Sequence, residues 1–235
     1  DKEGFLYPVE NDRCIHCNKC RDVCPIFNNK TQRYPDIKQY SAAAVSKNID
    51  VWTESTSGGA FVEISRTFGD ENTIIFGATF RGLKVIHSYV VGAQNANIFS
   101  KSKYVQSVLG NSFKETENFL KQGKKVVFSG TPCQIAGLKS YLNKDYDNLL
   151  CIDLICHGVG SPKVFDRSIK YLSDKYNSRI IKYTFRYKKV RFGNFREYVS
   201  NYYFENKKNA SEEIDIYNQL FLSQLCLRNS CQSNC

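Results

Sequence analysis

The sequence predicts an α/β fold with a mixed sheet, preceded by a small cysteine-rich region. From residue 40 onward, short apolar runs of strand type alternate with helical segments. Residues 124–176 form the clearest unit, in which strand, helix, strand and helix follow one another. The first 37 residues, in contrast, hold four closely spaced cysteines and lack apolar periodicity. These observations indicate one sizeable domain with a small appendage.

Before the central unit, the pattern predicts elements that alternate between strand and helix. In chain order they are an apolar run at 40–46, a helix opened by the glycines of 57–59 and reaching 68, paired strands at 72–80 and 84–91, and a helix at 111–124. The polar stretch at 28–36, which contains Pro35, is expected to be a linker between the cysteine-rich region and the body.

The central unit and the segments after it complete the predicted body. We expect a buried strand at 124–130, a helix at 131–142, a second strand at 149–156, a helix at 161–176, strands within 180–204, and an amphipathic helix at 212–227. The sequence contains no methionine and stops at Cys235 within a cysteine-containing segment. We therefore expect a chain that is cut at both ends.

The composition excludes fewer classes of function than the motifs do. Ten cysteines in 235 residues are too few for a disulfide scaffold. No apolar run reaches the roughly 18 residues needed to span a bilayer, and the first ten residues are charged, so a cytoplasmic protein without a membrane span is expected. The formal net charge of +10 is compatible with nucleic acid, an acidic membrane surface, an acidic protein partner or a phosphate-bearing cofactor.

The cysteine run has the spacing C-x2-C-x2-C-x3-C-P, which is typical of bacterial ferredoxins and predicts thiolate ligands for 4Fe-4S clusters. Its members are Cys14, Cys17, Cys20 and Cys24. A zinc knuckle or disulfides are the alternatives, but zinc sites usually pair two separated C-x2-C units. In two-cluster ferredoxins the fourth cysteine of each run serves the other cluster. Residues 1–37 are thus expected to be the second half of a two-cluster domain; a single cube remains the alternative.

Four motifs of the body appear in order: T-S-G-G around Ser57, S-K-Y-V-Q-S from Ser102, F-S-G-T-P-C-Q-I-A-G-L-K from Phe128 and D-L-I-C-H-G-V-G-S-P from Asp153. Together they resemble the coenzyme F420 hydrogenase/dehydrogenase beta-subunit family. The resemblance implies that residues 38–235 form an FAD-binding domain, C-terminally incomplete. It also implies an oxidoreductase that relays electrons between 4Fe-4S clusters and FAD. Its partners would be ferredoxin or other members of a redox complex, and a small-molecule acceptor such as a deazaflavin.

Two glycine-containing turns open helices and are candidate cofactor sites, because a helix N-terminus presents unpaired N–H groups and partial positive charge. They are Ser57-Gly58-Gly59 and Ser129-Gly130-Thr131-Pro132. Neither is a G-x-G-x-x-G motif, and a simple capped helix is the alternative. The resemblance adds Lys103 for a phosphate contact, Tyr104 for a stacking face, and Gln134.

Three body cysteines, Cys133, Cys156 and Cys231, match ligand positions of the family, whereas Cys235 departs from its C-x2-C spacing. Cys133 lies in a first helical turn, which favours a thiolate. Cys151 and Cys156 are expected on opposite faces of one strand, with Cys151 in the core. Cys156 and His157 would lie at the carboxyl end of that strand, where ligands of α/β proteins bind. His157 either transfers a proton or only donates a hydrogen bond.

Two other functions compete with a flavin oxidoreductase. One is a non-catalytic electron-transfer subunit of a larger redox complex. The other is an RNA-binding surface, because residues 182–198 interleave basic and aromatic side chains. Nothing else in the sequence supports RNA, and a phosphate-bearing cofactor or an acidic ferredoxin explains the charge equally well, so no nucleic-acid partner is expected.

Overall fold

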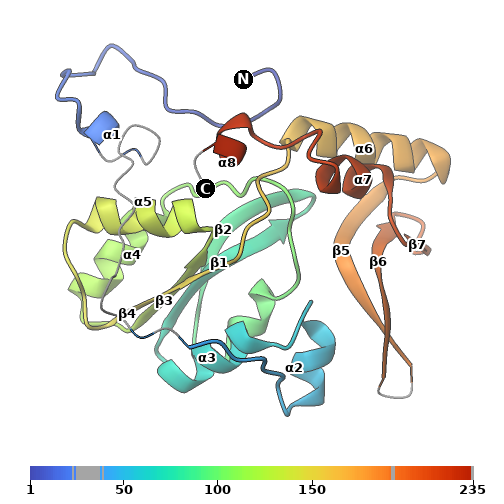
Figure 1. The fold of residues 1–235 in the computed structure, drawn as a ribbon, viewed down its shortest axis with the longest axis horizontal. Coiled ribbons are helices and arrows are strands. Elements are labelled where there is room, and N and C mark those ends of the chain that lie inside the picture. The colour runs from blue at the N-terminus through green and yellow to red at the C-terminus, as the bar shows by residue number, and fades with distance from the viewer. Residues whose placement is uncertain (23, 25–37, 39, 192–193, 234–235) are drawn as a thin grey trace.

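The computed structural model describes residues 1–22, 24, 38, 40–191 and 194–233, and it contains two sheets (Figure 1). The four-stranded sheet has the order β2-β1-β3-β4, and the three-stranded sheet has the order β5-β6-β7. β1 (Ile74–Arg81) pairs antiparallel with β2 (Lys84–Val91) and parallel with β3 (Val126–Gly130), which pairs parallel with β4 (Leu149–Asp153). The predicted mixed sheet is confirmed.

Side-chain alternation along β1 and β3 explains why helices cover both faces of this sheet. Ile74 and Phe76 face a core formed with α4 (Ser112–Lys121) and α5 (Pro132–Leu142). Ile75 and Val127 face the opposite core, which includes residues of α2 (Ile49–Glu54), α3 (Ala60–Phe68) and η1 (Ala93–Phe99). All five residues of β3 are buried, as expected for a central parallel strand.

The three-stranded sheet packs beside the first sheet and has its own core (Figure 1). It comprises β5 (Ile180–Arg191), β6 (Asn194–Phe204) and β7 (Asn209–Glu212) in an antiparallel meander. Helices α6 (Pro162–Lys175) and α7 (Ile216–Leu222) contribute Phe165 and Phe221 to this core. Two very short helices remain, α1 (Lys19–Asp22) and α8 (Asn229–Ser233).

Two predicted elements are wrong in extent. The strand expected at 149–156 ends at Asp153, because its partner β3 ends at Gly130 and turns into α5. Cys156 is therefore not a strand residue, and its expected position on the face opposite Cys151 does not apply. The helix expected at 212–227 covers only Ile216–Leu222, because Glu212 pairs with β6 and Asp215 caps the start of the helix.

The run at 40–46 forms no strand. Its backbone passes the glycine loop instead, where Ser46 N donates to Gly58 O at 2.7 Å. The remaining expected elements of the body are confirmed: the hairpin at 74–91, helices α3, α4, α5 and α6, and the strands β5 and β6.

The first residues of the chain pack on the body. Phe5 is buried, and Ser161 Oγ donates to Glu3 O at 2.6 Å. Arg228 donates to Leu6 O at 2.8 Å, and its guanidinium lies 4.1 Å from the centre of the Tyr7 ring. The start of the cysteine-rich region is thus attached near the C-terminal segment. Among the residues that the structure describes, no helix is long and apolar enough to cross a membrane.

Candidate functional site

One extended segment, residues 100–108, joins the two glycine turns; we call it the linking segment. At its start, Ser102 N donates to Thr56 Oγ1 at 3.0 Å, beside Ser57-Gly58-Gly59. Near its end, Gln134 Nε2 donates to Ser107 Oγ at 2.9 Å, beside Ser129-Gly130-Thr131-Pro132. The structure therefore brings the two candidate turns to the two ends of one short stretch of chain.

The glycines of the first turn are required by the packing of the chain itself. A Cβ at Gly58 would lie 2.0 Å from the carbonyl oxygen of Ala44. Gly59 has φ 89°, a left-handed conformation, and a Cβ there would lie 2.9 Å from Val51 Cγ1. Gly59 is also the N-cap of α3 and provides no side-chain cap, so the first N–H groups of this helix lack a capping side chain.

The second turn is a capped helix start. Thr131 N donates to Gln134 Oε1 at 3.0 Å, and Pro132 occupies the first helical position. A Cβ at Gly130 would lie 3.1 Å from the Gln134 side chain. Thr131 Oγ1 lies 3.2 Å from the Sγ of Cys133, and Cys133 is exposed. The turn therefore presents a hydroxyl and a thiol on its outer side.

His87 on β2 holds this second turn, although the sequence analysis did not select it. Its Nε2 lies 2.9 Å from Ser129 O, and its Nδ1 lies 3.0 Å from Ser107 Oγ. A carbonyl only accepts, so Nε2 carries the proton and Nδ1 accepts from the Ser107 hydroxyl. Burial lowers the pKa of His87, which favours this neutral form. The available signal was the alternation along 84–91, which places His87 with Val85 on the buried face.

Lys103 is a half-buried cation at the centre of the site. Its Nζ donates to the carbonyl oxygens of Phe99 and Ser100 at 2.8 and 2.7 Å. No carboxylate among the described residues lies within ion-pair distance of it. Burial of the ammonium group, with a smaller contribution from the nearby charge of Lys101, lowers the pKa of Lys103 to about 7. Such a group favours a bound anion as its counterion.

Tyr104, expected to offer a stacking face, already has one face covered. The Phe221 ring is stacked on it with centroids 4.7 Å apart. The Tyr104 carbonyl accepts from Tyr217 Oη at 2.6 Å. The linking segment is therefore anchored to α7 as well as to the two turns.

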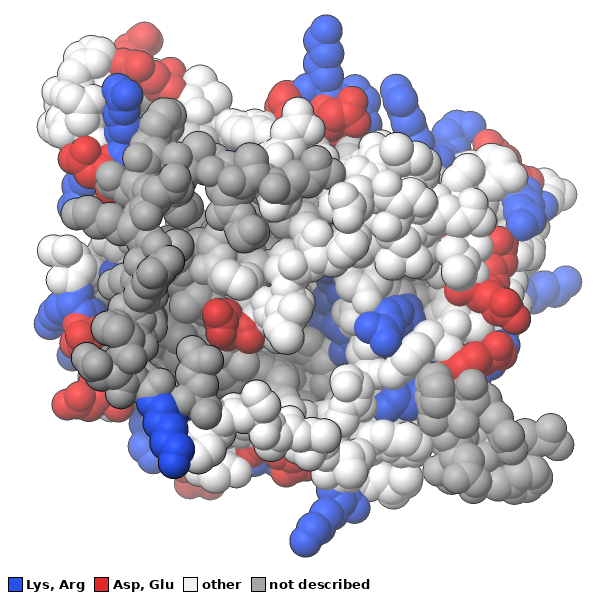
Figure 2. Space-filling view, viewed as in Figure 1, with Lys and Arg blue, Asp and Glu red and all other residues white. Residues whose placement is uncertain are grey.

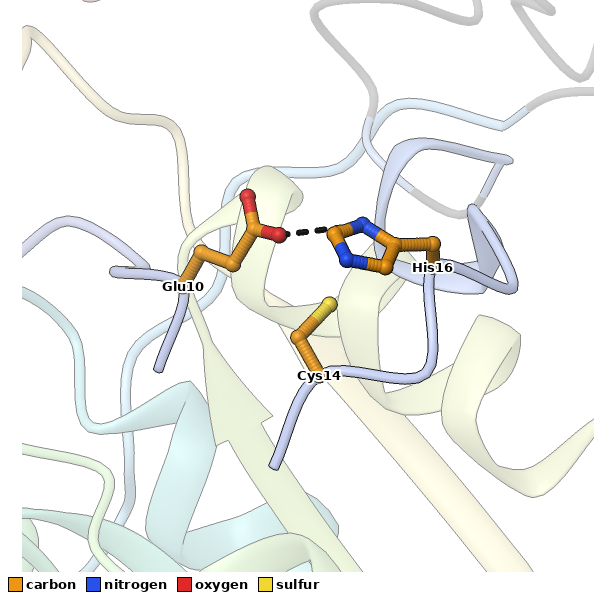
Figure 3. Close-up of side chains that lie close together, drawn as sticks. All are labelled: Glu10, Cys14 and His16. Atoms are coloured by element: carbon orange, nitrogen blue, oxygen red, sulfur yellow. Dashed lines mark ion pairs between the residues drawn. The ribbon is translucent and has the colours of Figure 1, made fainter. Parts of the chain in front are cut away.

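The four cysteines of the ferredoxin-type run lie at the surface. Cys14, Cys17 and Cys20 are exposed and Cys24 is half-buried. Figure 3 shows Glu10 and His16 beside Cys14, with Glu10 Oε1 3.1 Å from His16 Nδ1. In the described part of the chain, these three form the one group whose potential ligand atoms lie within 4.8 Å of one another. Among the described residues, the Sγ atoms of these cysteines therefore do not form such a group with one another.

Cys156 and Cys231 come from segments that run side by side. Gly160 pairs with Leu227 in an antiparallel bridge, and Arg228 N donates to Val159 O at 2.9 Å. Cys156 lies four residues before this bridge, and Cys231 lies in α8, which begins two residues after it. The His157 ring lies 5.3 Å from that of Phe221 and is exposed. Cys235 lies outside the described residues.

Cys151 and Cys226 pack within the protein. Cys151 is half-buried against the core that contains Phe128, and Cys226 is buried against the core of the second sheet. Burial raises the pKa of both thiols. Neither thiol is therefore poised as a thiolate.

A mixed sheet covered by helices, next to a cysteine run of ferredoxin spacing, is consistent with a redox protein that carries iron-sulfur clusters. Residues 123–235 match the family model that describes the C terminus of the beta subunit of coenzyme F420 hydrogenase/dehydrogenase. Over these residues, slightly less than half of the chain, the resemblance inferred from the motifs is confirmed.

A solved chain of the F420-reducing NiFe hydrogenase complex from Methanosarcina barkeri is similar at a TM-score of 0.46 and 16% sequence identity. The match covers 80% of this chain and 62% of the other, so the present chain spans less than two thirds of that structure. No curated protein matches the sequence.

Proposed function

We propose that the protein is an iron-sulfur flavoprotein oxidoreductase of the cytoplasm. In this proposal its cysteine run, with a contribution from Cys133, Cys156 or Cys231, ligates 4Fe-4S clusters. FAD binds along the linking segment. The protein exchanges single electrons with a partner such as ferredoxin or another member of a redox complex. It reduces or oxidises a two-electron substrate, either the deazaflavin coenzyme F420 or another acceptor.

The observation that carries this proposal is that the linking segment contacts both glycine turns and carries the half-buried ammonium of Lys103. A flavin dinucleotide needs N–H donors and positive charge where its diphosphate lies. The helix start after Gly59 supplies donors, and Lys103 supplies a charge without a counterion among the described residues. These residues fit an anionic cofactor.

Bound FAD would supply the conversion between one-electron and two-electron transfer. The chain's own residues have supporting roles. His87, Ser107 and Gln134 hold the second turn in one hydrogen-bonded arrangement. The exposed His157, beside Phe221, is the proposed proton donor or acceptor at the edge of the site.

The test is anaerobic purification followed by acid extraction. We expect released FAD and weaker FAD retention in Gly130→Val, because a branched side chain would press on Gln134 and distort the turn. Gly137→Ala, in the helix that follows this turn and with a Cβ site 3.5 Å from Phe113, is the control and should retain FAD. If wild-type protein neither releases nor rebinds FAD, the flavin proposal is wrong.

Iron content tests the ligand assignment separately. Serine variants of Cys14, Cys17 and Cys20 should lose iron, and at least one of Cys133→Ser, Cys156→Ser and Cys231→Ser should do so as well. The packed Cys151 and Cys226 provide matched serine controls. Unchanged cluster signals in all three body variants would show that those cysteines are structural.

The alternative, a non-catalytic electron-transfer subunit, predicts the same cofactors without turnover. An assay of the isolated protein with a dye donor separates the two. Reduction of a two-electron acceptor supports the enzyme, whereas electron transfer only in the presence of a partner protein supports the alternative.

A further inference from the structure

Arg186 on β5 sits in an irregularity of the strand that redirects its side chain. The pairing of β5 with β6 shifts register between Thr184 and Tyr187, and Arg186 has φ 42°, which is uncommon for a residue other than glycine. Its guanidinium lies 4.2 Å from the centre of the Tyr198 ring and makes a long hydrogen bond, 3.4 Å, to Tyr104 Oη. The bulge thus directs an exposed Arg toward the linking segment.

Lys188, two residues further along β5, has its ammonium group buried in the wall of the same site. Its Nζ donates to Trp52 O at 2.7 Å and to Ser57 O at 2.8 Å, and it lies 4.4 Å from the centre of the Trp52 ring. Its residue exposure is only 6%. Burying a cation is costly unless a counterion compensates it. Two carbonyls satisfy two of the three ammonium N–H groups and supply no negative charge.

Two neighbouring lysines, one on β5 and one in the linking segment, have carboxylate partners. Lys189 pairs with Glu197 at 2.9 Å and Lys101 pairs with Glu54 at 2.6 Å. In contrast, no ion pair of the described residues includes Lys103, Arg186 or Lys188. These three cations therefore lie at or beside the linking segment without a carboxylate partner among the described residues.

The surface is hollowed between the two segments that carry these residues, the linking segment and β5. Figure 2 shows basic side chains within a hollow at the middle of the view, between the linking segment and β5 as drawn in Figure 1. Contacts connect its walls: Tyr198 Oη donates to Thr56 O at 2.6 Å, and Thr56 also holds Ser102. The second sheet therefore forms one side of the site.

We propose that Arg186 and Lys188 of the second sheet, together with Lys103, bind the phosphate groups of a ligand in this hollow. The planar Arg186 guanidinium can bind two phosphate oxygens at once, and the lysines supply positive charge. The phosphate belongs either to the diphosphate of FAD or to a free anionic electron acceptor. The first source rests on the flavin of the proposed function, and the second rests on its electron acceptor.

The test measures inorganic pyrophosphate binding to the full chain by titration calorimetry. Arg186→Gln should weaken binding by about tenfold, because it removes a charge-assisted hydrogen-bonding pair. The control is Lys182→Gln, since Lys182 on the same strand lies 5.0 Å from the Tyr203 ring and has no carboxylate partner among the described residues. Lys188→Met should also weaken binding, with thermal unfolding used to check that this variant is folded.

Parallel titrations with FAD and riboflavin identify the source of the phosphate. If Arg186→Gln weakens FAD binding as much as pyrophosphate binding and leaves riboflavin unaffected, the diphosphate of FAD occupies the site. If it weakens only pyrophosphate binding, or if the wild type binds pyrophosphate but no flavin, the phosphate site stands and its ligand is the anionic acceptor. Equal losses in Arg186→Gln and Lys182→Gln, or no pyrophosphate binding by the wild type, would overturn the inference.

Discussion

His87 and Lys103 show how burial changes the charge of individual groups in the site. Burial lowers the pKa of both because the charged form loses its hydration. Their hydrogen-bond partners differ: His87 has a donor and an acceptor that suit a neutral ring, whereas Lys103 has only carbonyl acceptors, which suit an ammonium ion. We therefore expect different roles for the two residues, a structural role for His87 and an electrostatic role for Lys103.

For His87, we predict a loss of stability in acid. The unfolded chain takes up a proton below the ordinary pKa of 6.5, while the folded form with its lowered pKa does not. The free energy of unfolding should therefore fall as pH decreases below about 6.5. His87→Gln should be less stable but should lose this part of the pH dependence. Urea unfolding, followed through the single Trp52, measures it. Equal pH dependence in the wild type and His87→Gln, with exposed His157→Gln as control, would contradict the prediction.

For Lys103, we predict that the affinity for pyrophosphate falls as pH rises above about 7. At that pH the ammonium of the free protein begins to lose its proton, because its pKa is about 7 instead of the ordinary 10.5. An anion binds the charged form, so binding at higher pH must take up a proton. Calorimetry at pH 8 in two buffers of different ionisation enthalpy measures that uptake. Lys103→Met should bind pyrophosphate weakly and without proton uptake. If proton uptake persists in this variant, a group other than Lys103 takes up the proton.

Among the elements, α3 depends on a close backbone contact. The loop before this helix, at Gly58, packs against the segment at 44–46. Gly58→Ala should lower the free energy of unfolding by about 1–3 kcal/mol, because its Cβ would collide with a backbone oxygen that cannot rotate away. Gly137→Ala, inside α5, should instead raise it by about 0.5–1 kcal/mol, since alanine favours a helix and the Cβ has room. Chemical denaturation compares the two. A neutral Gly58→Ala would show that the loop at 44–46 moves aside freely.

At the scale of the whole molecule, a buried polar cluster joins the second sheet to α7. The fully buried Asp215 accepts from Tyr202 Oη at 2.9 Å and from Tyr183 Oη, and it caps α7 through Asn218 N at 2.8 Å. Because α7 also holds the linking segment through Tyr217, this cluster determines where the second sheet stands relative to the candidate site.

We predict that Asp215→Ala destabilises the protein by about 2–5 kcal/mol, since it leaves two buried tyrosine hydroxyls unpaired and removes a helix cap. It should also weaken pyrophosphate binding. Asp174→Ala removes an exposed partner of Lys170 and should change stability by less than about 0.5 kcal/mol. Thermal unfolding and calorimetry check both effects. Unchanged pyrophosphate affinity in a destabilised but folded Asp215→Ala would show that the second sheet does not control the site.

Local signals in the sequence determined the cysteine run, the mixed sheet and most helices. Spacing alone selects Cys14, Cys17, Cys20 and Cys24 as candidate cluster ligands, because the cysteines of such a run follow one another within one short loop. Alternation identifies the buried face of β2, and Thr131-Pro132 marks the start of α5, because these preferences depend on neighbouring residues.

Only the tertiary structure decided which distant residues share the candidate site. The end of β4, and hence the position of Cys156, depends on where β3 stops. The proton position on His87 depends on Ser107 and Ser129, which are 20 and 42 residues away in the chain. Arg186 and Lys188 reach Tyr104 and Ser57 only because the second sheet packs against loops of the first sheet. No local pattern encodes these contacts, because packing between elements creates them.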